Sequence, residues 1–368
     1  MRVYFLRGGA TVREVKEAPE GGPDLEDLER HLKEASRYKL VIGAFSAASN
    51  VTGILTDVNA VTRLLKSYGA YAIWDYAGGG PYLPMDMGRV PEEQKDAIVF
   101  SSHKFPGGPG GSGVMVVRDT IVKRRTPTLP GGGTVSFVSP QGHRYSESVS
   151  AREEAGTPNV VGDVRAALAL LVKEAIGTEF IAKRDRELRD RALSVWQDNT
   201  SIELLGNSEA SEALPIFSFR VRGPRGLLIH HQLFTRLLSD VHGIQARGGC
   251  ACAGSYAHRL LNITETKSKE ILAKILEGEE LKKPGWIRLN LSYLLSDDAA
   301  DFIIHSVDDL ARHASDYVTQ YDVDEATARF RPRVAEPGLE ACRSKDASQS
   351  GTLVNCAPLG KRMADGRS

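Results

Sequence analysis

The sequence has no excess of charge of either sign and no long apolar run. Its 47 lysine and arginine residues balance 47 aspartate and glutamate residues. The composition therefore gives no electrostatic reason to expect nucleic acid or an acidic membrane surface as a partner. Apolar stretches are short and interrupted by charge, so we expect no membrane span. The first residues, MRVYFLRGG, are a poor match to a secretory or transit leader.

Cysteine is scarce as well. Four cysteines in 368 residues do not form a disulfide framework. Cys250 and Cys252 are too close in sequence for an unstrained bridge. We therefore expect a reducing, cytoplasmic compartment, with an organellar one as the alternative. The length is sufficient for two domains, and the hydrophobic fraction of 41% is ordinary for a globular protein.

The first half of the chain alternates helical and strand patterns. Helices are predicted at residues 24–37 and 55–70, and apolar strands at 38–47, 71–80, 96–104 and 112–119. This alternation predicts an α/β domain with a mostly parallel sheet. Reactive side chains gather at the carboxyl edge of such sheets. Asn50, Asp75 and Lys104 all lie at or just beyond the carboxyl end of a predicted strand.

The second half predicts a smaller α/β domain. A long helix over 163–199 leads into strands at 214–223 and 285–296 and helices at 230–243 and 297–318. We expect a large domain over 1–165, and a linking helix with a small C-terminal domain over 166–322. Residues 323–368 are polar and irregular in composition and predict a disordered tail.

Lys104 lies in the stretch AIVFSSHKFPGGPGGSG, residues 97–113. A lysine at the end of a buried strand is paired, modified or catalytic, unless it is simply a surface lysine at a strand end. Ser101, Ser102 and His103 add hydroxyl and ring donors, and glycine N–H groups follow them. That set suits a phosphate beside an amine. The glycines equally fit a tight loop that returns to the next strand.

Asp75 ends a neighbouring strand, in WDYAGGG. A carboxylate there is able to pair with a protonated heterocyclic nitrogen, whereas the alternative is a turn former before the glycines. An amine for a Schiff base and an acid for a pyridinium nitrogen are what pyridoxal phosphate requires of a protein.

Three segments together resemble the class V pyridoxal-phosphate enzymes, the aminotransferases and cysteine desulfurases: WDYAGGG, FSSHKFPGGPGGSG and REEAGTPN. The resemblance extends over about residues 38 to 315. It implies the fold of pyridoxal-phosphate-dependent transferases of type I, with a mostly parallel large domain and a smaller C-terminal α/β domain. It also implies that Lys104 is the Schiff-base lysine and that Asp75 contacts the pyridine nitrogen.

The resemblance assigns further contacts. Asn50, in SAASNVTG, corresponds to an asparagine near the cofactor's ring oxygen, and Ser101 and His103 belong to the cofactor site. Thr134, in PGGGT, corresponds to a contact with the cofactor phosphate of the neighbouring subunit, so the resemblance implies a homodimer. Arg288 corresponds to the arginine that binds the substrate carboxylate, which suits a forked guanidinium.

The segment IQARGGCACAG, residues 244–254, bears on the reaction. In cysteine desulfurases a cysteine at the spacing of Cys252 from Arg247 takes sulfur from the substrate as a persulfide. The resemblance therefore makes Cys252 the nucleophile, with Cys250 as the alternative or as a resolving partner. Arg247 contributes to substrate binding and favours a thiolate.

Two other interpretations of this segment stay open. One is a small packing turn with inert thiols. The other is a metal site that recruits His242 or His258, although Cys-x-Cys lacks a second ligand pair at useful spacing. Our own expectation is that no metal binds.

The sequence departs from the family in two places. Gly78 stands where the group usually has histidine or glutamine. No Gly-x-Thr phosphate loop and no residue to stack on the cofactor ring precede Asn50, so we expect the chain to lack the family's N-terminal portion. We expect a cysteine desulfurase-like enzyme that acts on an amino acid, with a sulfur-acceptor protein as a further partner. The alternatives are an aminotransferase or lyase on the same scaffold, or an inactive homologue.

Overall fold

The computed structural model describes residues 10–250 and 254–333, and the chain forms two compact units. The first unit contains the residues up to Ser49 together with 54–183. The second contains Asn50–Gly53 and the described residues from Arg184 onward. The division therefore lies inside helix α6 (Thr178–Trp196) rather than at residue 165, and a short N-terminal segment belongs with the C-terminal unit.

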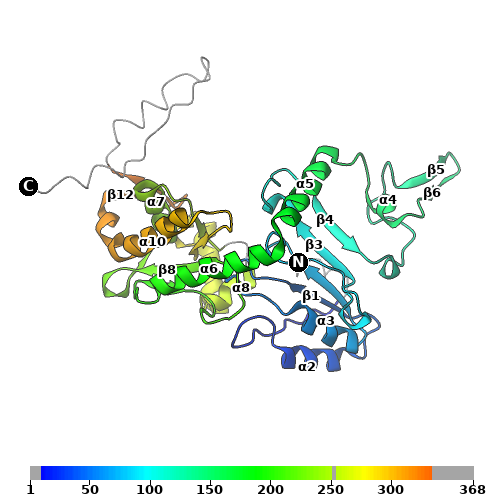
Figure 1. Cartoon of the computed structure of the whole chain (residues 1–368), viewed down its shortest axis with the longest axis horizontal. Helices are drawn as coiled ribbons and strands as arrows, with labels where there is room; N and C mark the ends of the chain where they lie inside the picture. Colours follow the sequence, from blue (N-terminus) through cyan, green and yellow to red (C-terminus); the bar gives the residue numbers. More distant parts are fainter. Residues whose placement is uncertain (1–9, 251–253, 334–368) are drawn as a thin grey trace, which may run out of the picture. The chain divides into compact units, whose positions relative to one another are not determined.

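The first unit is built on a four-stranded sheet in the order β1-β2-β3-β4 (Figure 1). Strands β1, β2 and β3 are parallel, and β4 is antiparallel to β3. The sequence analysis predicted all four strands, and the mostly parallel sheet is confirmed. The strand bounds are Ile42–Ser46 for β1, Tyr71–Asp75 for β2, Ala97–Ser101 for β3 and Gly113–Val117 for β4.

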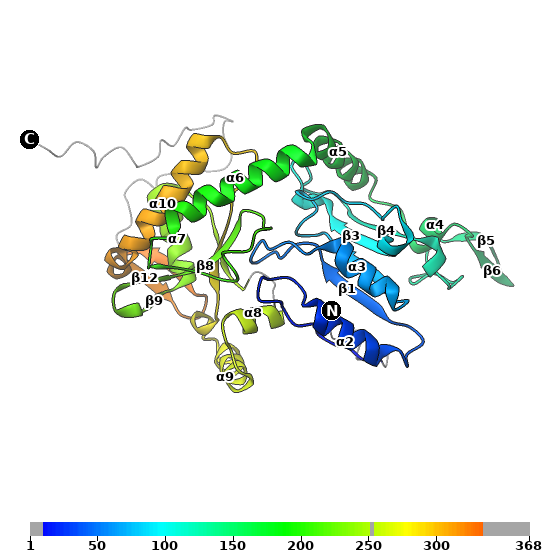
Figure 2. The ribbon, with the colours of Figure 1, turned by 60° about the horizontal axis from the view of Figure 1, so that its bottom comes forward.

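Two capped helices pack together in this unit, α2 (Leu25–Ala35) and α3 (Val58–Ser67), and lie side by side (Figure 2). An aspartate caps each one. The Asp24 carboxylate accepts from two N–H groups of the first turn of α2, and Asp57 does the same once for α3. The apolar side of α3 meets β2, where the buried Trp74 ring donates to the Thr62 hydroxyl at 3.0 Å.

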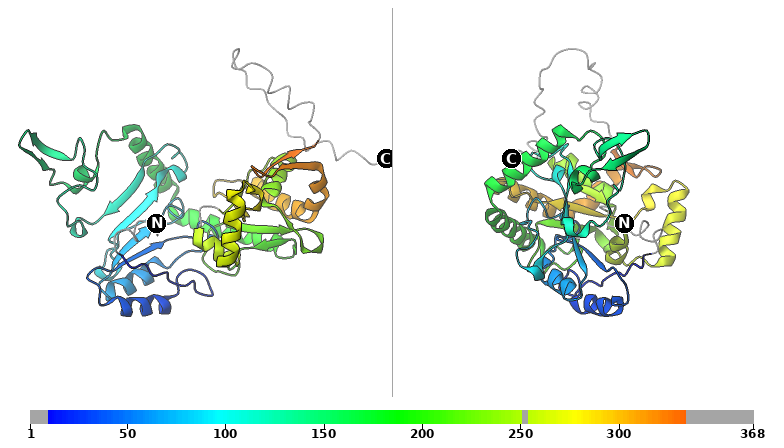
Figure 3. Two further views of the ribbon diagram at one scale, coloured as in Figure 1. Left: turned by 180° about the vertical axis from the view of Figure 1, so that it is seen from behind. Right: turned by 90° about the vertical axis from the view of Figure 1, so that its right-hand side faces the viewer.

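A two-stranded hairpin, β5 (Val135–Ser139) and β6 (Gly142–Tyr145), stands apart from the four-stranded sheet (Figures 1 and 3). The sequence analysis did not predict it. Short helix α4 (Val149–Glu153) follows. The hairpin presents Phe137 and Val138 to solvent, which leaves apolar surface away from the core.

The predicted long helix over 163–199 is two helices. Helix α5 (Val160–Ile176) ends at Gly177, and α6 begins at Thr178. Gly177 has φ +85°, a left-handed conformation that glycine adopts without steric cost. The alanine-leucine periodicity runs through this glycine and hides the break.

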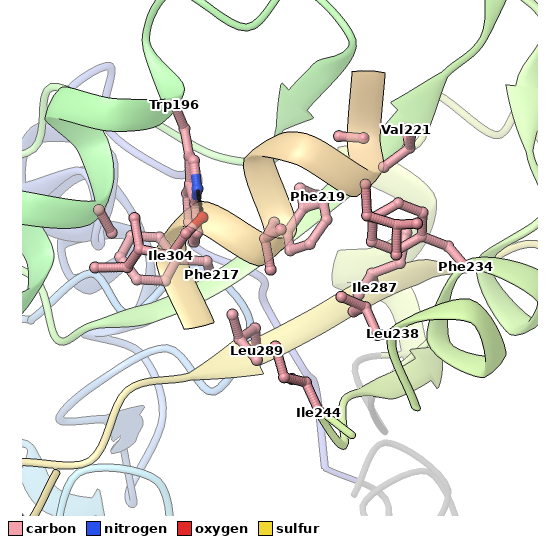
Figure 4. Close-up of a cluster of buried hydrophobic side chains, with 14 of the residues drawn as sticks. Trp196, Phe217, Phe219, Val221, Phe234, Leu238, Ile244, Ile287, Leu289 and Ile304 are labelled. Atoms are coloured by element: carbon pink, nitrogen blue, oxygen red, sulfur yellow. Dashed lines mark hydrogen bonds between the residues drawn. The ribbon is translucent and has the colours of Figure 1, made fainter. Parts of the chain in front are cut away.

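The second unit contains an antiparallel sheet with the path β10-β11-β8-β7, and β9 also pairs with β8. Its core is aromatic: the Trp196 ring lies 4.9 Å from that of Phe217, and Phe219 packs edge-on to Phe234 (Figure 4). The indole N–H of Trp196 donates to the Ile304 carbonyl at 3.0 Å, so the one polar atom of this ring is satisfied.

The remaining elements of the second unit are mostly short. A hairpin of β12 and β13 corrects the prediction of a disordered tail from residue 323, although residues 334–368 lie outside the described part. The helix bounds are His231–His242 (α7), Gly254–Leu260 (α8), Glu265–Leu276 (α9) and Asp297–Tyr317 (α10). The strand bounds are Ile202–Leu204 (β7), Ile216–Arg222 (β8), Leu228–Ile229 (β9), Arg247–Gly249 (β10), Trp286–Asn290 (β11), Tyr321–Asp324 (β12) and Arg329–Pro332 (β13). Single turns of 3-10 helix in this unit lie at Pro224–Gly226 (η4), Glu280–Lys282 (η5) and Val318–Gln320 (η6), and those of the first unit lie at Pro91–Glu93 (η1), Ser102–Lys104 (η2) and Asp119–Ile121 (η3).

Candidate functional site

Asp75 is the last residue of β2, at the carboxyl edge of the parallel strands. Its side chain is exposed, and one carboxylate oxygen accepts from the N–H of Ala77 at 2.7 Å. The pairing of β2 with β3 sets Asp75 beside Val99, and the N–H of Tyr76 donates to the Val99 carbonyl. The neighbouring strands β1 and β3 thus fix the backbone of Asp75. Only one carboxylate oxygen takes part in the turn with Ala77.

Lys104 does not lie in strand β3 as predicted. The strand ends at Ser101, and Ser102–Lys104 form a single turn of 3-10 helix, η2. The Lys104 side chain is exposed, and the next residue, Phe105, is buried. The turn therefore places an amine at the sheet edge while the following ring anchors it to the core.

The glycine-rich loop after Lys104 is a tight return. The N–H of Gly108 donates to the Phe105 carbonyl, and that of Gly111 donates to the Gly108 carbonyl. A Cβ on Gly108 would lie 2.0 Å from the Ser102 carbonyl oxygen. Buried Ser102 donates to the Ser112 carbonyl at 2.5 Å. Gly108 and Gly111 are required by close backbone approach, which supports a tight return loop. That the loop also binds a phosphate stays a prediction. Half-buried Ser101 and exposed His103 stay at the sheet edge.

Thr134 is fully buried in the loop that precedes the β5–β6 hairpin. Its hydroxyl donates to the Gly131 carbonyl at 2.6 Å and accepts from the Gly131 N–H at 3.3 Å. The hydroxyl thus closes its own turn. The exposed glycines of PGGGT form the outer face of this loop.

The segment Asn50–Gly53 is held by strands of the second unit. The Asn50 carbonyl accepts from the Arg288 guanidinium at 3.1 Å, and the Val51 carbonyl accepts from Ser218 at 2.7 Å. The Gly53 carbonyl accepts from the N–H of Leu214. The sequence analysis placed Asn50 in the large N-terminal domain. Its contacts with residues far along the chain place it in the second unit instead.

Arg247 and Arg288 are directly opposite each other on antiparallel strands β10 and β11. Opposite residues of such a pair project from the same face of a sheet. Two guanidinium groups so placed repel each other, and a bound anion would offset that repulsion. The predicted substrate arginines are therefore brought together by strand register.

Cys250 follows β10 and is half-buried. Its thiol donates to the Pro284 carbonyl at 2.7 Å, and burial raises the pKa of the thiol. A raised pKa leaves less thiolate at neutral pH, which makes Cys250 a poor nucleophile. Cys252, the preferred nucleophile, lies outside the described residues. A polar pocket of this unit is lined by Arg247, Cys250 and Lys283, among others.

A match to the family model described as aminotransferase class-V covers residues 5–269 of the chain. The chain belongs to the class V aminotransferase family. It is 32% identical over 254 residues to a probable cysteine desulfurase of Aeropyrum pernix, which spans 67% of this chain and 58% of that protein. It is 31% identical over 261 residues to a probable cysteine desulfurase of Pyrococcus abyssi, over 71% of this chain and 61% of that protein. The chain thus aligns with about three fifths of the length of these curated relatives.

Solved structures show the same fold. A cysteine desulfurase from Thermococcus onnurineus matches with a TM-score of 0.67 and 23% identity, over 84% of this chain and 68% of that one. The cysteine desulfurase CsdA of Escherichia coli matches with a TM-score of 0.64 and 23% identity, over 84% of this chain and 67% of that one. The class V chain therefore has the type I fold of pyridoxal-phosphate-dependent transferases, as predicted.

The chemistry of the first unit fits the pyridine end of that cofactor. Asp75, an exposed carboxylate at the end of β2, suits a pyridinium nitrogen. Lys104, an exposed amine just past the end of β3, suits an aldehyde. Among the described residues, no cluster of three or more metal-binding side chains is found. His258 uses both ring nitrogens in contacts with Gly254 and Ser268. Within the part of the chain described, no helix is long and apolar enough to cross a bilayer.

Sequence analysis of this class V chain missed Lys173. This lysine is buried on α5, where its amine contacts the loop that follows Asp75. The signal was present in the spacing, because Gly162, Ala166, Ala169 and Lys173 recur on one face of the helix and all four are buried.

Proposed function

We propose that the chain is a pyridoxal-phosphate-dependent enzyme that acts on an amino acid, of the cysteine desulfurase type. The observation that carries the proposal is the exposed pair at the sheet edge, the Asp75 carboxylate and the Lys104 amine. Membership of the class V family and the names of the curated relatives support it. We propose that Lys104, Asp75, Asn50, Ser101 and His103 hold the cofactor.

Each charged group has a task that its chemistry suits. Bound pyridoxal phosphate would supply a protonated heterocycle that accepts electrons from the substrate's α-carbon. Asp75 keeps the proton on the pyridine nitrogen, since a nearby carboxylate favours the charged ring. Lys104 would hold the cofactor through its aldehyde, and its amine would remove the α-proton of the substrate.

The second unit supplies substrate recognition. Arg288 and Arg247 bind the substrate carboxylate, since two guanidinium groups opposite each other suit one anion. The contact from Arg288 to the Asn50 carbonyl fixes the orientation of that arginine.

Sulfur transfer uses Cys252. Its thiolate attacks the substrate sulfur; an S–S bond forms as the substrate Cβ–S bond breaks, and the electron pair stays on carbon. Protonation of that carbon and return of a proton from Lys104 to the α-carbon give alanine, and Cys252 keeps the sulfur as a persulfide for a sulfur-acceptor protein. The raised pKa and hydrogen bond of Cys250 argue against it as the nucleophile.

We also propose that the chain works as a homodimer. Helix α5 exposes a stripe of apolar side chains at helical spacing, and the β5–β6 hairpin exposes two more, a combination that suits burial against a second copy. The residues are Val160, Val161, Val164, Leu168, Leu171, Val172, Phe137 and Val138. Light scattering on the purified chain should give a dimer mass, and the double variant Val164→Glu/Leu168→Glu should give a monomer. A wild-type monomer at working concentrations would contradict this.

The function is tested with free cysteine. The chain is mixed with pyridoxal phosphate, cysteine and a thiol reductant, and sulfide and alanine are measured together. We expect equal amounts of both, and we expect Cys252→Ser to abolish them while the bound-cofactor absorbance persists. Cofactor binding without sulfide, but with amino-group transfer to a keto acid, would favour the aminotransferase alternative. Absence of any bound cofactor would favour an inactive homologue.

A further inference from the structure

Lys173 is a buried amine that the proposed reaction does not use. Its side chain lies on α5 with 6% of the residue exposed. The amine donates to the Gly80 carbonyl at 2.6 Å and to the Leu83 carbonyl, and it lies 5.7 Å from the centre of the Phe105 ring. Burial lowers the pKa of Lys173 to about 8. Such a group is costly to bury, so its contacts must offset a large desolvation penalty.

The two carbonyls belong to the loop that leaves Asp75. This loop closes on itself: the N–H of Gly80 donates to the Tyr76 carbonyl at 2.6 Å, and that of Leu83 to the Gly79 carbonyl at 2.9 Å. Gly79 and Gly80 are buried, and Gly78 is half-buried. The carbonyls of Gly80 and Leu83 turn instead toward α5, where Lys173 meets both.

The aromatic ring belongs to the turn that carries Lys104. Phe105 is buried, its N–H donates to the Ser102 carbonyl at 3.0 Å, and its ring packs on Phe100. The loop after Asp75 presses on the same ring, since a Cβ on Gly80 would lie 3.1 Å from it. One ammonium therefore touches the continuation of both functional segments: two carbonyls after Asp75 and a ring face after Lys104.

We propose that Lys173 is a positioning residue that couples the segments carrying Asp75 and Lys104, and so fixes the carboxylate relative to the amine. The effect of this coupling on catalysis rests on the proposed function. The coupling itself does not depend on that function and is measurable without cofactor. Lys95 provides the matched comparison. It is also buried in the same unit, yet its amine contacts the side chains of Asp86 and Asn59 rather than the Gly80 and Leu83 carbonyls or the Phe105 ring.

The test compares Lys173→Met, Lys173→Gln and Lys95→Met in the full chain. Methionine fills the space without donors, whereas glutamine keeps an N–H donor without charge. The first readout is amide hydrogen exchange without cofactor. We expect Lys173→Met to speed exchange in residues 76–83 and 102–105 together, Lys173→Gln to restore much of the protection, and Lys95→Met to leave both segments as in wild type.

The second readout is covalent labelling of Lys104 by pyridoxal phosphate, trapped with borohydride and quantified by mass spectrometry. Misplacing reacting groups by about 1 Å costs on the order of 100-fold in rate, so we expect Lys173→Met to label roughly 10- to 100-fold more slowly at unchanged thermal stability, with Lys173→Gln intermediate.

The outcomes separate the two proposals. If wild type is not labelled, the proposed function fails, and the exchange data still decide the coupling. If Lys173→Met exchanges and labels as wild type does, or changes only one of the two segments, the coupling is wrong. Failure of both Lys173 variants to fold would also overturn the coupling, because Lys173 would then stabilise the whole first unit rather than the relative position of Asp75 and Lys104.

Discussion

The two units place their charged groups in different ways. In the first, the proposed reactive pair lies at the carboxyl edge of the parallel strands: Asp75 ends β2, Lys104 follows β3, and both side chains are exposed. In the second, Arg247 and Arg288 lie on the face of an antiparallel sheet, opposite each other by register. An exposed side chain at a strand end has room to move, which suits the proton transfer proposed for Lys104. Side chains on a sheet face are held at a fixed spacing, which suits the carboxylate recognition proposed for Arg247 and Arg288.

Asp75→Asn tests the first half of this comparison and should have the largest effect. Asparagine keeps the acceptor for the N–H of Ala77, so the turn is preserved while the charge is lost. We expect kcat for sulfide release to fall about 10³-fold, the order expected for proton chemistry, with KM little changed. Exposed Asp119→Asn serves as the control. A fall of only a few-fold would remove Asp75 from the chemistry.

A second change concerns a buried acid of the second unit. Asp185 lies on α6, both its carboxylate oxygens lack a hydrogen-bond partner among the described residues, and burial raises its pKa to about 7. The pKa of Asp185 is higher in the folded than in the unfolded chain. Its contribution to the free energy of unfolding is therefore fully present below about pH 4 and is lost as the pH rises to about 7. Asp185→Asn removes this loss, so we expect it to stabilise the protein by about 2 to 4 kcal/mol at pH 8 and very little at pH 4.

Urea unfolding at both pH values measures this difference. Equal shifts at pH 4 and pH 8 would mean that the Asp185 carboxyl does not ionise in that range.

Arg288→Lys sharpens the second half of the comparison. Lysine keeps the charge but loses the forked donors that match a carboxylate and the contact with the Asn50 carbonyl. We expect KM for the amino acid to rise roughly 10- to 100-fold with a smaller change in kcat. Exposed Arg186→Lys is the control on the same unit. A fall in kcat at constant KM would place Arg288 in the chemical step instead.

Cys250→Ser should have the smallest effect. The serine hydroxyl is able to replace the thiol as a donor to the Pro284 carbonyl, and the thiol is not expected to carry sulfur. Sulfide release should stay close to wild type, in contrast with its loss in Cys252→Ser. Loss of sulfide release in Cys250→Ser with a retained fold would reverse the assignment of the two thiols.

The sequence was informative where pattern is local. Strands β1 to β4 are apolar runs bounded by turns, and α2, α3, α7 and α10 have apolar periodicity with caps, so each was predicted close to its place. The candidate pair followed because the carboxyl ends of parallel strands share one edge.

What the sequence hid depends on contacts between distant residues. Nothing near Asn50 indicates that its carbonyl meets Arg288 or that Ser218 holds Val51. The break at Gly177 is a single residue within an unbroken periodicity. Each strand of the β12–β13 hairpin alternates charged with apolar residues over only four positions, a signal too short to stand out from the polar segment that follows. The carbonyl partners of Lys173, Gly80 and Leu83, are likewise far from it in sequence.

The most direct test of the central claim is to locate the cofactor on the chain. Wild type and Lys104→Ala are incubated with pyridoxal phosphate, reduced with borohydride, digested and mapped by mass spectrometry. The account predicts one pyridoxyl group, on Lys104, in wild type and none at that peptide in the variant. Label confined to other lysines, Lys173 included, or equal labelling of both proteins would contradict it.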